Sequence, residues 1–586
     1  MSELSRFTHI VVGGGSAGCV MAARLSERPD FRVLLIEAGA DLPPDSNPAD
    51  ILERYGGRAF GNLSYFWPTL RASRGTNVNI PQAAQEYAFY HQARVLGGGS
   101  SINAQIALRG TPGDYASWVK SGADAWAWKD VLPFFKKLEN DLDYTNELHG
   151  QDGPIPIKRV PPSDWDFFTR AVTQLWTAQG YAHLADMNGE FGDGFASVPF
   201  SNDGTTRWSS ARGYLSSAVR SRPNLQIVSM AEVHRVIFVQ GNAVGVEGVR
   251  GGEKATWYGD QIILTAGALH TPKLLMLSGV GPGAELQSHG IRVVADREGV
   301  GNNLQDHPSV YVSAYLPPTT RNSGTYRGPA TYLRYSSGID NCPPSDMIMI
   351  ATGRSGWHDI GSQLGTVLPF IGIPFSRGCV KLASPDPTQS PDVCFNYLDD
   401  ERDRVRMVDG FRRAAAALLS DGVAKVCDTP FPTRYSPRVT KLAVPTRTNA
   451  ALTKCLAVAL DTSKPVRTFL INNVLTETPK LAYLLANEHA LSEYVCGSVS
   501  TIWHPAGTCR MGRFDDSLAV TDGTGKVFGV ENLYVADASV MPNVPSTNTN
   551  LPTMMVAERV AYGLTSVALS SGISLWDEAR CRLSSL

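Results

Sequence analysis

The glycine pattern near the start of the chain restricts the possible fold more than any other feature. Gly13, Gly15 and Gly18 fit the spacing G-x-G-x-x-G, between a strand-like run at 7–12 and a helical pattern at 16–26. Glycines so placed permit a tight turn, a close approach of the backbone to a pyrophosphate, and close packing of helix on strand. The first N–H groups of the helix attract phosphate oxygens. The pattern therefore predicts a βαβ unit that binds a dinucleotide.

A carboxylate follows this motif at the place where a dinucleotide site needs one. Residues 32–37 are typical of a buried parallel strand, apolar on both faces, and they end on Glu37. A carboxylate at that position can accept hydrogen bonds from ribose hydroxyls. The motif alone does not distinguish FAD from NAD. It is the first element of the chain and no second such motif follows, although an enzyme that couples a flavin to NAD(P) often needs two.

The charge balance argues against nucleic acid as a partner. Lys plus Arg number 53 and Asp plus Glu 55, a net charge of −2 without a basic run. Such a chain has no long-range field that attracts a polyanion. No apolar stretch approaches the ~20 residues that span a bilayer, and a strand pattern from Phe7 leaves no room for a signal peptide. We therefore expect a cytoplasmic protein without a membrane span.

The cysteines indicate no metal site. Nine are scattered from Cys19 to Cys581, and none forms a C-x-x-C pair. The spacing therefore matches neither a zinc ribbon nor a thioredoxin motif. In a reducing cytoplasm most of these thiols are expected to be small, buried, apolar side chains.

Regular α/β patterns occur in separate parts of the chain. An apolar strand at 261–265 precedes a helix expected to begin at Pro272. Between 310 and 495 the pattern changes, because Pro, Ser and Arg are common and the strands are short. A strand at 533–536 and a helix at 552–569, with proline in its first turn, restore the α/β pattern. The sequence thus predicts an α/β dinucleotide domain assembled from several segments, with an inserted α+β domain that has an antiparallel sheet.

Six further motifs follow the first glycine pattern in a fixed order. They are RVLGGGSSIN at 94–103, TAGALHTP at 265–272, SGVGP at 278–282, WHPAGTCRMG at 503–512, VADAS at 535–539 and PSTNTNLP at 545–552. The set resembles the glucose–methanol–choline (GMC) oxidoreductases over nearly the whole chain. The resemblance implies an FAD-binding, Rossmann-like domain of the GMC type at 1–160, 205–310 and 495–570. It also implies a substrate-binding domain at 161–204 and 311–494, and a C-terminal tail at 571–586.

The resemblance also implies which residues contact FAD. The first glycine motif and Glu37 correspond to the ADP half, the loop at 95–104 to the isoalloxazine and pyrophosphate, and Val233 to adenine. Some family members attach the flavin covalently through a histidine, but the matching residue here is Ile102, so non-covalent FAD is expected. The implied FAD-binding residues are Gly13, Gly15, Ser16, Ala17, Gly18, Glu37, Ala38, Val95, Gly98, Ser101, Asn103, Ala104, Val233, Asp537, Ala538 and Thr549.

His504 and Asn548 are the implied catalytic pair. Removing hydride from an alcohol also requires removal of the hydroxyl proton, and histidine suits that role because its ordinary pKa lies near 6.5. His504 matches the active-site histidine of the family, and Asn548 matches a second position that is His or Asn. Asparagine cannot take a proton at pH 7, so it is expected to orient the alcohol, with flavin N5 as hydride acceptor. His307, in an LQDHP run, is interpreted as structural.

Two aromatic residues are candidates for the walls of the substrate pocket, Trp503 and Phe370. An aromatic pocket favours a flat aryl or furan alcohol. Choline would instead need aromatic rings and a carboxylate near its quaternary nitrogen. YFWP at 65–68, GPIPI at 153–157 and VPSTNTNLP at 544–552 are most similar to the 5-hydroxymethylfurfural oxidase and aryl-alcohol oxidase branch.

Several alternatives stay open at this point. The same half-reaction on a choline-like, pyridoxine or aliphatic alcohol could pass electrons to a quinone-type acceptor instead of O2. A hydroxynitrile lyase could use the same fold with a structural FAD. The segment at 430–487 is longer than the family minimum, and could line the entrance or form an oligomer contact. The oligomeric state does not follow from these motifs.

Overall fold

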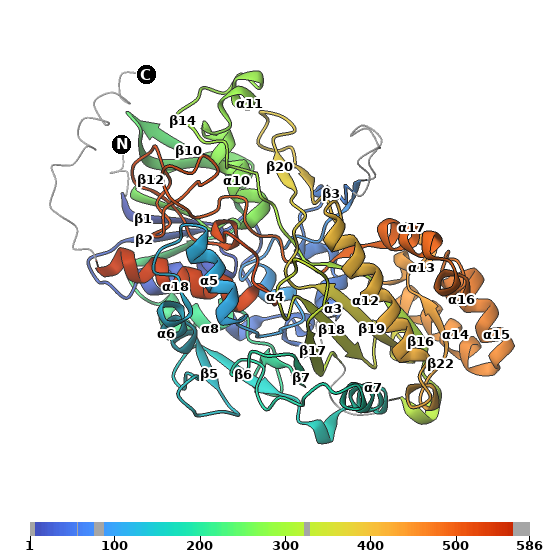
Figure 1. The fold of residues 1–586 in the computed structure, drawn as a ribbon. Helices are drawn as coiled ribbons and strands as arrows, with labels where there is room; N and C mark the ends of the chain where they lie inside the picture. Colours follow the sequence, from blue (N-terminus) through green and yellow to red (C-terminus); the bar gives the residue numbers. More distant parts are fainter. Residues whose placement is uncertain (1–5, 55–56, 76–86, 322–327, 567–586) are drawn as a thin grey trace.

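The computed structural model describes residues 6–54, 57–75, 87–321 and 328–566. Figure 1 shows two bodies side by side. One contains the first and last strands of the chain, and the other contains most of the middle of the sequence. The predicted tail at 571–586 and the last residues of the predicted helix at 552–569 lie outside the described residues.

A seven-stranded sheet forms the first body and brings together the start, middle and end of the chain. Its order is β10–β11–β12–β1–β2–β9, with β24 beside β12. The long strand β12 pairs antiparallel with β11 through residues 253–258 and parallel with β1 through residues 259–264. The strand bounds are β1 (Phe7–Val12), β2 (Val33–Ile36), β9 (Leu225–Val228), β10 (Ala231–Val239), β11 (Asn242–Arg250), β12 (Glu253–Leu264) and β24 (Leu533–Val535).

Three helices of this body determine the shape of the dinucleotide site. They are α1 (Ser16–Leu25), α10 (Gly267–Leu277) and α18 (Asn550–Ser566). Helix α18 packs against α1, and an ion pair of 2.8 Å joins the half-buried Arg24 to the buried Glu558 across the two helices. The predicted βαβ unit is confirmed, because β1 and β2 are parallel neighbours with α1 between them in sequence.

The predicted start of the helix at Pro272 is wrong, because α10 already begins at Gly267 and Pro272 lies inside it. The carboxylate of Asp537 accepts hydrogen bonds from the backbone N–H of Gly267 (2.8 Å) and the hydroxyl of Thr271 (2.6 Å). A partner 270 residues away thus satisfies the first turn of the helix. Because the capping residue is so distant in the sequence, the residues around Pro272 do not indicate that the helix begins earlier.

An eight-stranded antiparallel sheet forms the second body, as the sequence predicted for the inserted domain. Its order is β22–β16–β19–β18–β17–β7, and the short strands β15 and β23 join at one side. Helix α12 (Glu401–Leu419) packs against β19. The strand bounds are β7 (Gly194–Ser197), β15 (Pro308–Ser309), β16 (Val312–Tyr315), β17 (Thr331–Tyr335), β18 (Met347–Thr352), β19 (Leu364–Ile371), β22 (Asp428–Pro432) and β23 (Ser500–Thr501).

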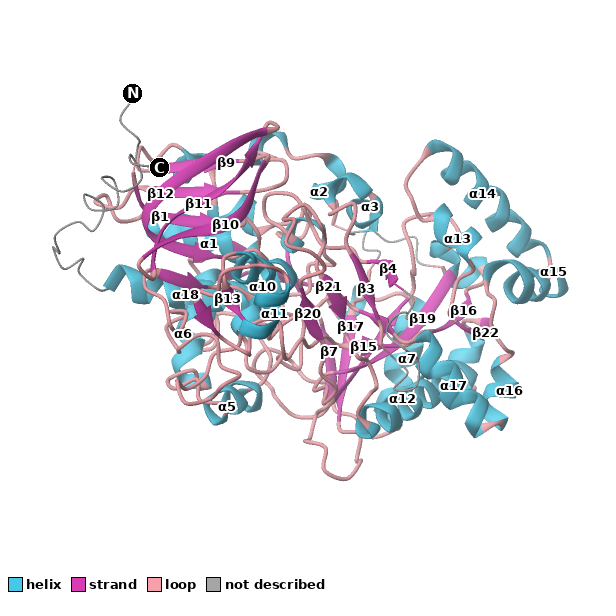
Figure 2. Cartoon of the chain, turned by 90° about the horizontal axis from the view of Figure 1, so that it is seen from above, coloured by secondary structure: helices cyan, strands magenta, loops and turns pink. Residues whose placement is uncertain are grey.

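A group of short helices extends the second body away from the seven-stranded sheet (Figures 1 and 2). Side-chain oxygens of Ser436, Thr446, Ser463 and Asn487 accept backbone hydrogen bonds at four of its helix starts, which explains why the helices begin there. The helices are α13 (Pro437–Leu442), α14 (Arg447–Thr462), α15 (Lys464–Leu470), a π-helical turn (Ile471–Leu475), α16 (Leu481–Ala486) and α17 (Glu488–Ser498).

Smaller elements connect the two bodies. Three small sheets contain β3 (Arg71–Ser73), β4 (Tyr87–Phe89), β20 (Cys379–Lys381) and β21 (Asp392–Cys394); β5 (Glu139–Asp141), β6 (Ile155–Arg159) and β8 (Pro199–Ser201); and β13 (Val280–Gly281) and β14 (Ala295–Asp296). Helices outside the groups above are α2 (Ala49–Leu52), α3 (Gly57–Gly61), α4 (Gly99–Ile102), α5 (Pro112–Lys120), α6 (Trp128–Leu138), α7 (Phe167–Ala178), α8 (Ser210–Tyr214), α9 (Ser217–Arg220) and α11 (Gly283–Ser288). Among the described residues, no helix combines the length and apolarity that crossing a bilayer requires. The exact domain boundaries stay a prediction.

Candidate active site

A cavity of about 540 Å³ lies between the two bodies and is lined by segments from both. One end is bordered by β1, α1 and the β10 region, and the other by β17, β18 and the segment before His504. The sequence-predicted residues that line it are Gly13, Gly15, Ser16, Ala17, Glu37, Ala38, Val95, Gly98, Asn103, Ala104, Val233, Trp503, His504, Asp537, Ala538, Asn548 and Thr549.

The glycine loop has the shape that a dinucleotide requires. A Cβ on Gly18 would lie 1.9 Å from the carbonyl oxygen of Gly13, so only glycine permits this contact between helix and strand. At Gly15 a Cβ would meet only the Thr265 carbonyl at 3.9 Å, and at Gly99 it would meet nothing within 4 Å. Gly15 at the N-terminus of α1 and Gly99 at the start of α4 therefore leave backbone open to the cavity, where a pyrophosphate fits. Gly18 does not line the cavity, because its role is the packing contact.

Glu37 lies at the end of β2 and faces the cavity. Its two carboxylate oxygens accept backbone hydrogen bonds from Gly14 and Gly39, each 2.7 Å long. Burial raises the pKa of Glu37, and these backbone N–H groups oppose that shift. The carboxylate is thus held in one orientation with further acceptor capacity for ribose hydroxyls.

Other residues in the predicted FAD set support the backbone instead of facing the cavity. The Ser101 hydroxyl donates to the Leu96 carbonyl (2.9 Å) and closes the glycine-rich loop, and Ser101 does not line the cavity. Ile102, at the end of α4, does line it. A hydrogen bond of 2.7 Å from Gly97 N–H to the Gly14 carbonyl fixes this loop against the first glycine motif.

His504 and Asn548 face each other in the cavity, although 44 residues separate them. The Asn548 amide nitrogen lies 3.0 Å from Nε2 of His504, and the Asn548 amide oxygen accepts a 2.7 Å hydrogen bond from the Tyr332 hydroxyl. Because Tyr332 donates to the oxygen, the amide N–H group is directed at His504. Nε2 of His504 is then the acceptor, so this nitrogen carries a lone pair and no proton.

His307 contacts the other nitrogen of the same imidazole. The Nδ1 atoms of His307 and His504 are 2.8 Å apart, so one ring donates and the other accepts. Burial lowers the pKa of His307 to about 3, so its ring is neutral. Because Asn548 requires an unprotonated Nε2 on His504, neutral His504 carries its proton on Nδ1 and donates it to Nδ1 of His307. Neutral His307 then carries its own proton on Nε2, a buried atom that has no hydrogen-bond partner among the described residues.

Both histidines are held at the backbone by one carboxylate. Oδ1 of Asp306 accepts hydrogen bonds from the backbone N–H groups of His307 and His504, each 2.8 Å long, and the other oxygen accepts from Thr501. Pairing of β15 with β23 brings these segments together.

Burial raises the pKa of Asp306 to about 6. Burial and the neighbouring His307 hold the pKa of His504 well below its usual value, so this base is neutral at pH 7.

Aromatic rings form one wall beside His504. Phe60 lies 4.8 Å from Trp503 in an edge-to-face arrangement and 4.6 Å from His91 in a stacked arrangement. Burial lowers the pKa of His91 to about 4, so the ring is neutral. Phe370, expected as a wall, does not line the cavity, because it lies behind His307 and Tyr332 at 5.5 and 6.0 Å. Phe60, His91 and Tyr332 had no motif that singled them out in the sequence.

Charged side chains of both signs line the cavity. Within the described residues, the lining carboxylates are Glu37, Glu232 and Asp537, all from segments around the FAD site. Three cations also line the cavity, Arg54, Lys273 and Arg354. None of the three described lining carboxylates comes from the second body.

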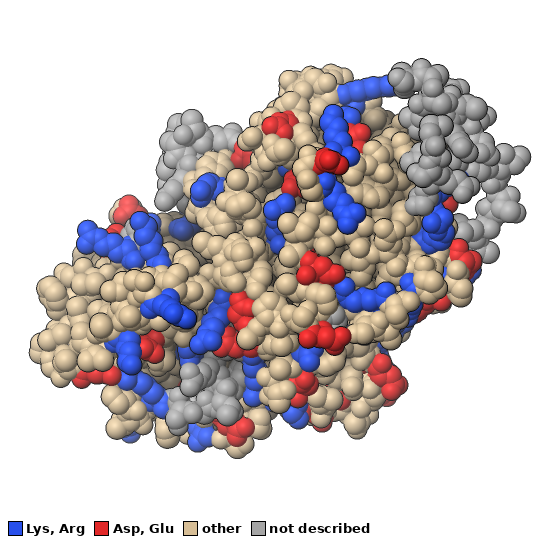
Figure 3. Space-filling view, turned by 180° about the vertical axis from the view of Figure 1, so that it is seen from behind, with Lys and Arg blue, Asp and Glu red and all other residues tan. Residues whose placement is uncertain are grey.

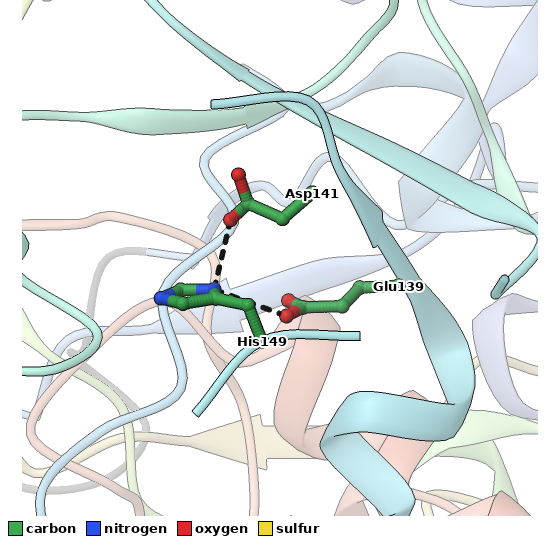
Figure 4. Close-up of side chains that lie close together, drawn as sticks. All are labelled: Glu139, Asp141 and His149. Atoms are coloured by element: carbon green, nitrogen blue, oxygen red, sulfur yellow. Dashed lines mark hydrogen bonds and ion pairs between the residues drawn. The ribbon is translucent and has the colours of Figure 1, made fainter. Parts of the chain in front are cut away.

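A second cluster of titratable groups lies outside the cavity (Figure 4). Glu139, Asp141 and His149 are buried and close enough to hold an ion together. Their atoms already form ion pairs, however: Nδ1 of His149 lies 2.9 Å from Asp141, and Arg109 and Arg159 neutralise the carboxylates. Burial lowers the pKa of His149, but hydrogen bonds to Asp141, Asp186 and Glu139 outweigh it and raise the pKa to about 10. In this structure the cluster is an ion-pair network, because each of the three side chains already pairs with a charged neighbour.

Sequence models of one family match most of the chain. Both are described as GMC oxidoreductase, one over residues 7–309 and the other over residues 374–557. A 5-(hydroxymethyl)furfural oxidase of Methylovorus sp. is 40% identical over 96% of this chain and 99% of its own length. A mitochondrial choline dehydrogenase of Mus musculus is 32% identical over 95% of this chain and 89% of its own length. The crystal structure of pyridoxine 4-oxidase from Mesorbium loti is 27% identical with a TM-score of 0.78, covering 96% of this chain and 100% of that one.

Proposed function

Because this chain belongs to the GMC oxidoreductase family and is an FAD enzyme that acts on alcohols, we propose that it oxidises a primary aryl or furan alcohol to the aldehyde. The observation that carries this proposal is the His504–Asn548 pair, placed 3.0 Å apart beside an aromatic wall in the cavity. Neither side chain is needed merely to hold a dinucleotide. We assign His504 as the base and Asn548 as the group that orients the alcohol.

The residues around His504 supply a base with a defined proton position. An alcohol bound between the two side chains would replace their 3.0 Å hydrogen bond. Its hydroxyl proton would pass to the Nε2 lone pair, and the Asn548 amide N–H would donate to its oxygen instead. Nδ1–H of His504 keeps its hydrogen bond to His307, and this bond strengthens when the ring becomes cationic. When bound, FAD supplies the hydride acceptor. The FAD is proposed to be non-covalent, since Ile102 cannot form the histidyl link of some family members.

The cavity supports a flat, uncharged substrate. Rings of Phe60, His91 and Trp503 offer surfaces on which an aryl or furan ring can stack. A quaternary ammonium needs a nearby carboxylate as well as aromatic faces, and none of the described lining carboxylates comes from the second body. Choline is therefore a poor candidate. Reoxidation by O2 is proposed from the likeness to the furfural oxidase.

The test is the visible spectrum of the purified, FAD-supplied protein without oxygen. Addition of a primary aryl or furan alcohol should bleach the flavin bands, and admission of air should restore them. His504→Ala should bind FAD and bleach about 10²–10⁴-fold more slowly, the usual contribution of a general base. Bleaching that only a quinone-type acceptor reverses would make the protein a dehydrogenase. A faster reaction with choline, or no bleaching by any alcohol, would contradict the proposal.

A further inference from the structure

The helical segment at 434–487, called the helical lobe below, has a charge unlike the rest of the chain. It contains eight basic residues and two acidic ones, a net charge of +6, whereas the whole chain has −2. The remainder therefore carries −8. Figures 1 and 2 place the lobe at the far end of the molecule from the seven-stranded sheet. The adjoining helix α17 adds Glu488 and Glu493 and no Lys or Arg, so the excess of positive charge lies on the helices that precede it. The basic residues are Arg434, Arg438, Lys441, Arg447, Lys454, Lys464, Arg467 and Lys480, and the acidic ones Asp461 and Glu477.

Most of these cations have no structural role within the lobe. Arg467 is buried and pairs with Asp428 at 2.8 Å. The other seven basic side chains are exposed, and none of them lies in an ion pair with a carboxylate of the described residues. In Figure 3 the lobe is at the left, where blue groups and a few red ones border a broad uncharged surface. Exposed cations without partners attract an anionic surface.

The same lobe exposes an unusual amount of apolar side chain. Six of the sixteen large hydrophobic residues that are exposed in the described structure lie between 452 and 483. Val458 and Phe469 are each 62% exposed. The six are Leu452, Val458, Val466, Phe469, Val474 and Tyr483. An apolar surface of this kind, rimmed by charges, marks a contact surface and not ordinary solvent-facing protein.

Helix α14 exposes apolar side chains in addition to those that it buries in the core of the lobe. Its inner face buries Thr453, Ala457 and Leu460. On its outer face Leu452, Cys455 and Val458 are exposed at spacings of three, so they form a second, unpartnered apolar stripe. Helix α15 packs beside α14 and exposes Val466 and Phe469, again three residues apart.

We propose that the helical lobe docks the protein on the surface of an anionic lipid bilayer, without crossing it. Exposed apolar side chains among lysines and arginines are the combination that binds at a lipid interface. Each cation near an anionic membrane adds to the attraction. A symmetric contact between the lobes of two copies is disfavoured, because each lobe carries a charge of +6.

The lobe adjoins the substrate end of the cavity. The Trp357 indole donates a 2.6 Å hydrogen bond to the Ala443 carbonyl in the lobe, and Trp357 in turn accepts from Arg354, which lines the cavity. A Cβ on Gly61 would lie 2.9 Å from Pro445, so α3 also packs closely on the lobe. Docking would therefore place this end of the cavity near the bilayer, where apolar alcohols and lipid-soluble electron acceptors collect.

The experiment is co-sedimentation of the FAD-loaded, full-length protein with vesicles. Phosphatidylcholine vesicles with about 30% phosphatidylglycerol should bind the protein at least tenfold better than pure phosphatidylcholine. Raising the ionic strength from about 0.01 M to 0.15 M shortens the screening length from ~30 Å to ~8 Å and should weaken this binding.

Two pairs of substitutions test the two components of the surface. Lys454→Glu with Lys464→Glu should abolish binding to anionic vesicles, and Val458→Ser with Phe469→Ser should reduce it at least fivefold. Matched controls on the first body are Lys120→Glu with Lys129→Glu, two exposed lysines, and Phe514→Ser, which removes a ring that is 68% exposed. The controls should bind vesicles like the wild type, and all variants should oxidise dissolved alcohols at the wild-type rate.

Two results would overturn the inference. One is the absence of binding to anionic vesicles, or binding that the lobe variants and the controls reduce equally. The other is sedimentation velocity that shows a dimer dispersed by Val458→Ser with Phe469→Ser while vesicles bind no protein. That result would assign the surface to a second copy of the chain.

Discussion

Trp503 adopts a backbone conformation that is rare for a bulky residue. Its φ is +61°, in the left-handed region, which costs about 1–2 kcal/mol for a residue with a Cβ. Two hydrogen bonds hold it there: its own N–H donates to Thr501 (2.7 Å), and the next N–H, of His504, donates to Asp306 (2.8 Å). The turn directs the indole toward Phe60 while His504 faces Asn548. Local strain at this position thus serves the geometry of the proposed base.

Tyr332→Phe tests whether the amide orientation sets the tautomer of His504. Without the tyrosine hydroxyl, the Asn548 amide loses the donor that fixes its oxygen, and both amide orientations become populated. One hydrogen bond contributes about 1 kcal/mol, so we expect kcat to fall roughly five- to tenfold with little change in KM. Steady-state kinetics with an aryl alcohol measures both constants.

Tyr335→Phe is the matched control for this substitution. Tyr335 lies on the same strand and is buried, but its hydroxyl has no hydrogen-bond partner among the described residues. Its removal should leave kcat and KM unchanged. Equal effects of the two substitutions would show that Tyr332 acts only through packing.

Asn548→Asp should shift the pH dependence of activity upward. In the wild type, burial and His307 lower the pKa of His504, so the neutral base persists below pH 6.5 and activity falls only at more acidic pH. A carboxylate beside Nε2 favours the protonated ring and raises this pKa. The acidic limb of kcat/KM should therefore move to higher pH in the variant. Identical pH profiles would argue that His504 is not the titrating base.

At the scale of single elements, the contact between α1 and β1 depends on one glycine. Gly18→Ala places a methyl group where the Gly13 carbonyl now lies, 1.9 Å away, so the helix must move away from the strand. We expect loss of FAD during gel filtration and a melting temperature lower by several degrees. Gly563→Ala is the control, because that position lies in α18 with nothing within 4 Å, and alanine there should be neutral or slightly stabilising. Full FAD retention by Gly18→Ala would contradict the tight contact.

At the scale of the whole molecule, the ion-pair network in Figure 4 predicts how stability depends on pH. The folded pKa of His149 is raised to about 10 from an unfolded value near 6.5. Its contribution is therefore complete below pH 6.5 and is lost as the pH rises towards 10. His149→Gln should lower the melting temperature at pH 6, since removing one partner of a buried ion pair costs about 3–5 kcal/mol. Thermal melts between pH 6.5 and 10 measure this effect. The difference in melting temperature between the wild type and His149→Gln should shrink as the pH rises through that range. A constant difference would contradict the charged state of His149.

The sequence by itself determined the family, the FAD enzyme and the overall architecture. The glycine motif, Glu37 and the later motifs are contiguous runs, and each depends on local backbone chemistry that neighbouring residues specify. The change from an α/β pattern to short strands after residue 310 likewise predicted the antiparallel second sheet. FAD binding and the fold class are confirmed, while the catalytic roles of His504 and Asn548 stay predictions.

Only the tertiary structure decided which distant side chains meet. His307 and His504 are 197 residues apart, and the pairing of β15 with β23 brings their segments together. Tyr332 and Asn548 are 216 residues apart, and their hydrogen bond joins strand β17 to the segment before α18. Phe370 was predicted to form a wall of the pocket, but it packs behind His307 and Tyr332 instead. The physical reason is that the chemistry of a side chain limits which partners it can bind. The packing of sheets and helices determines which of those partners lies within reach.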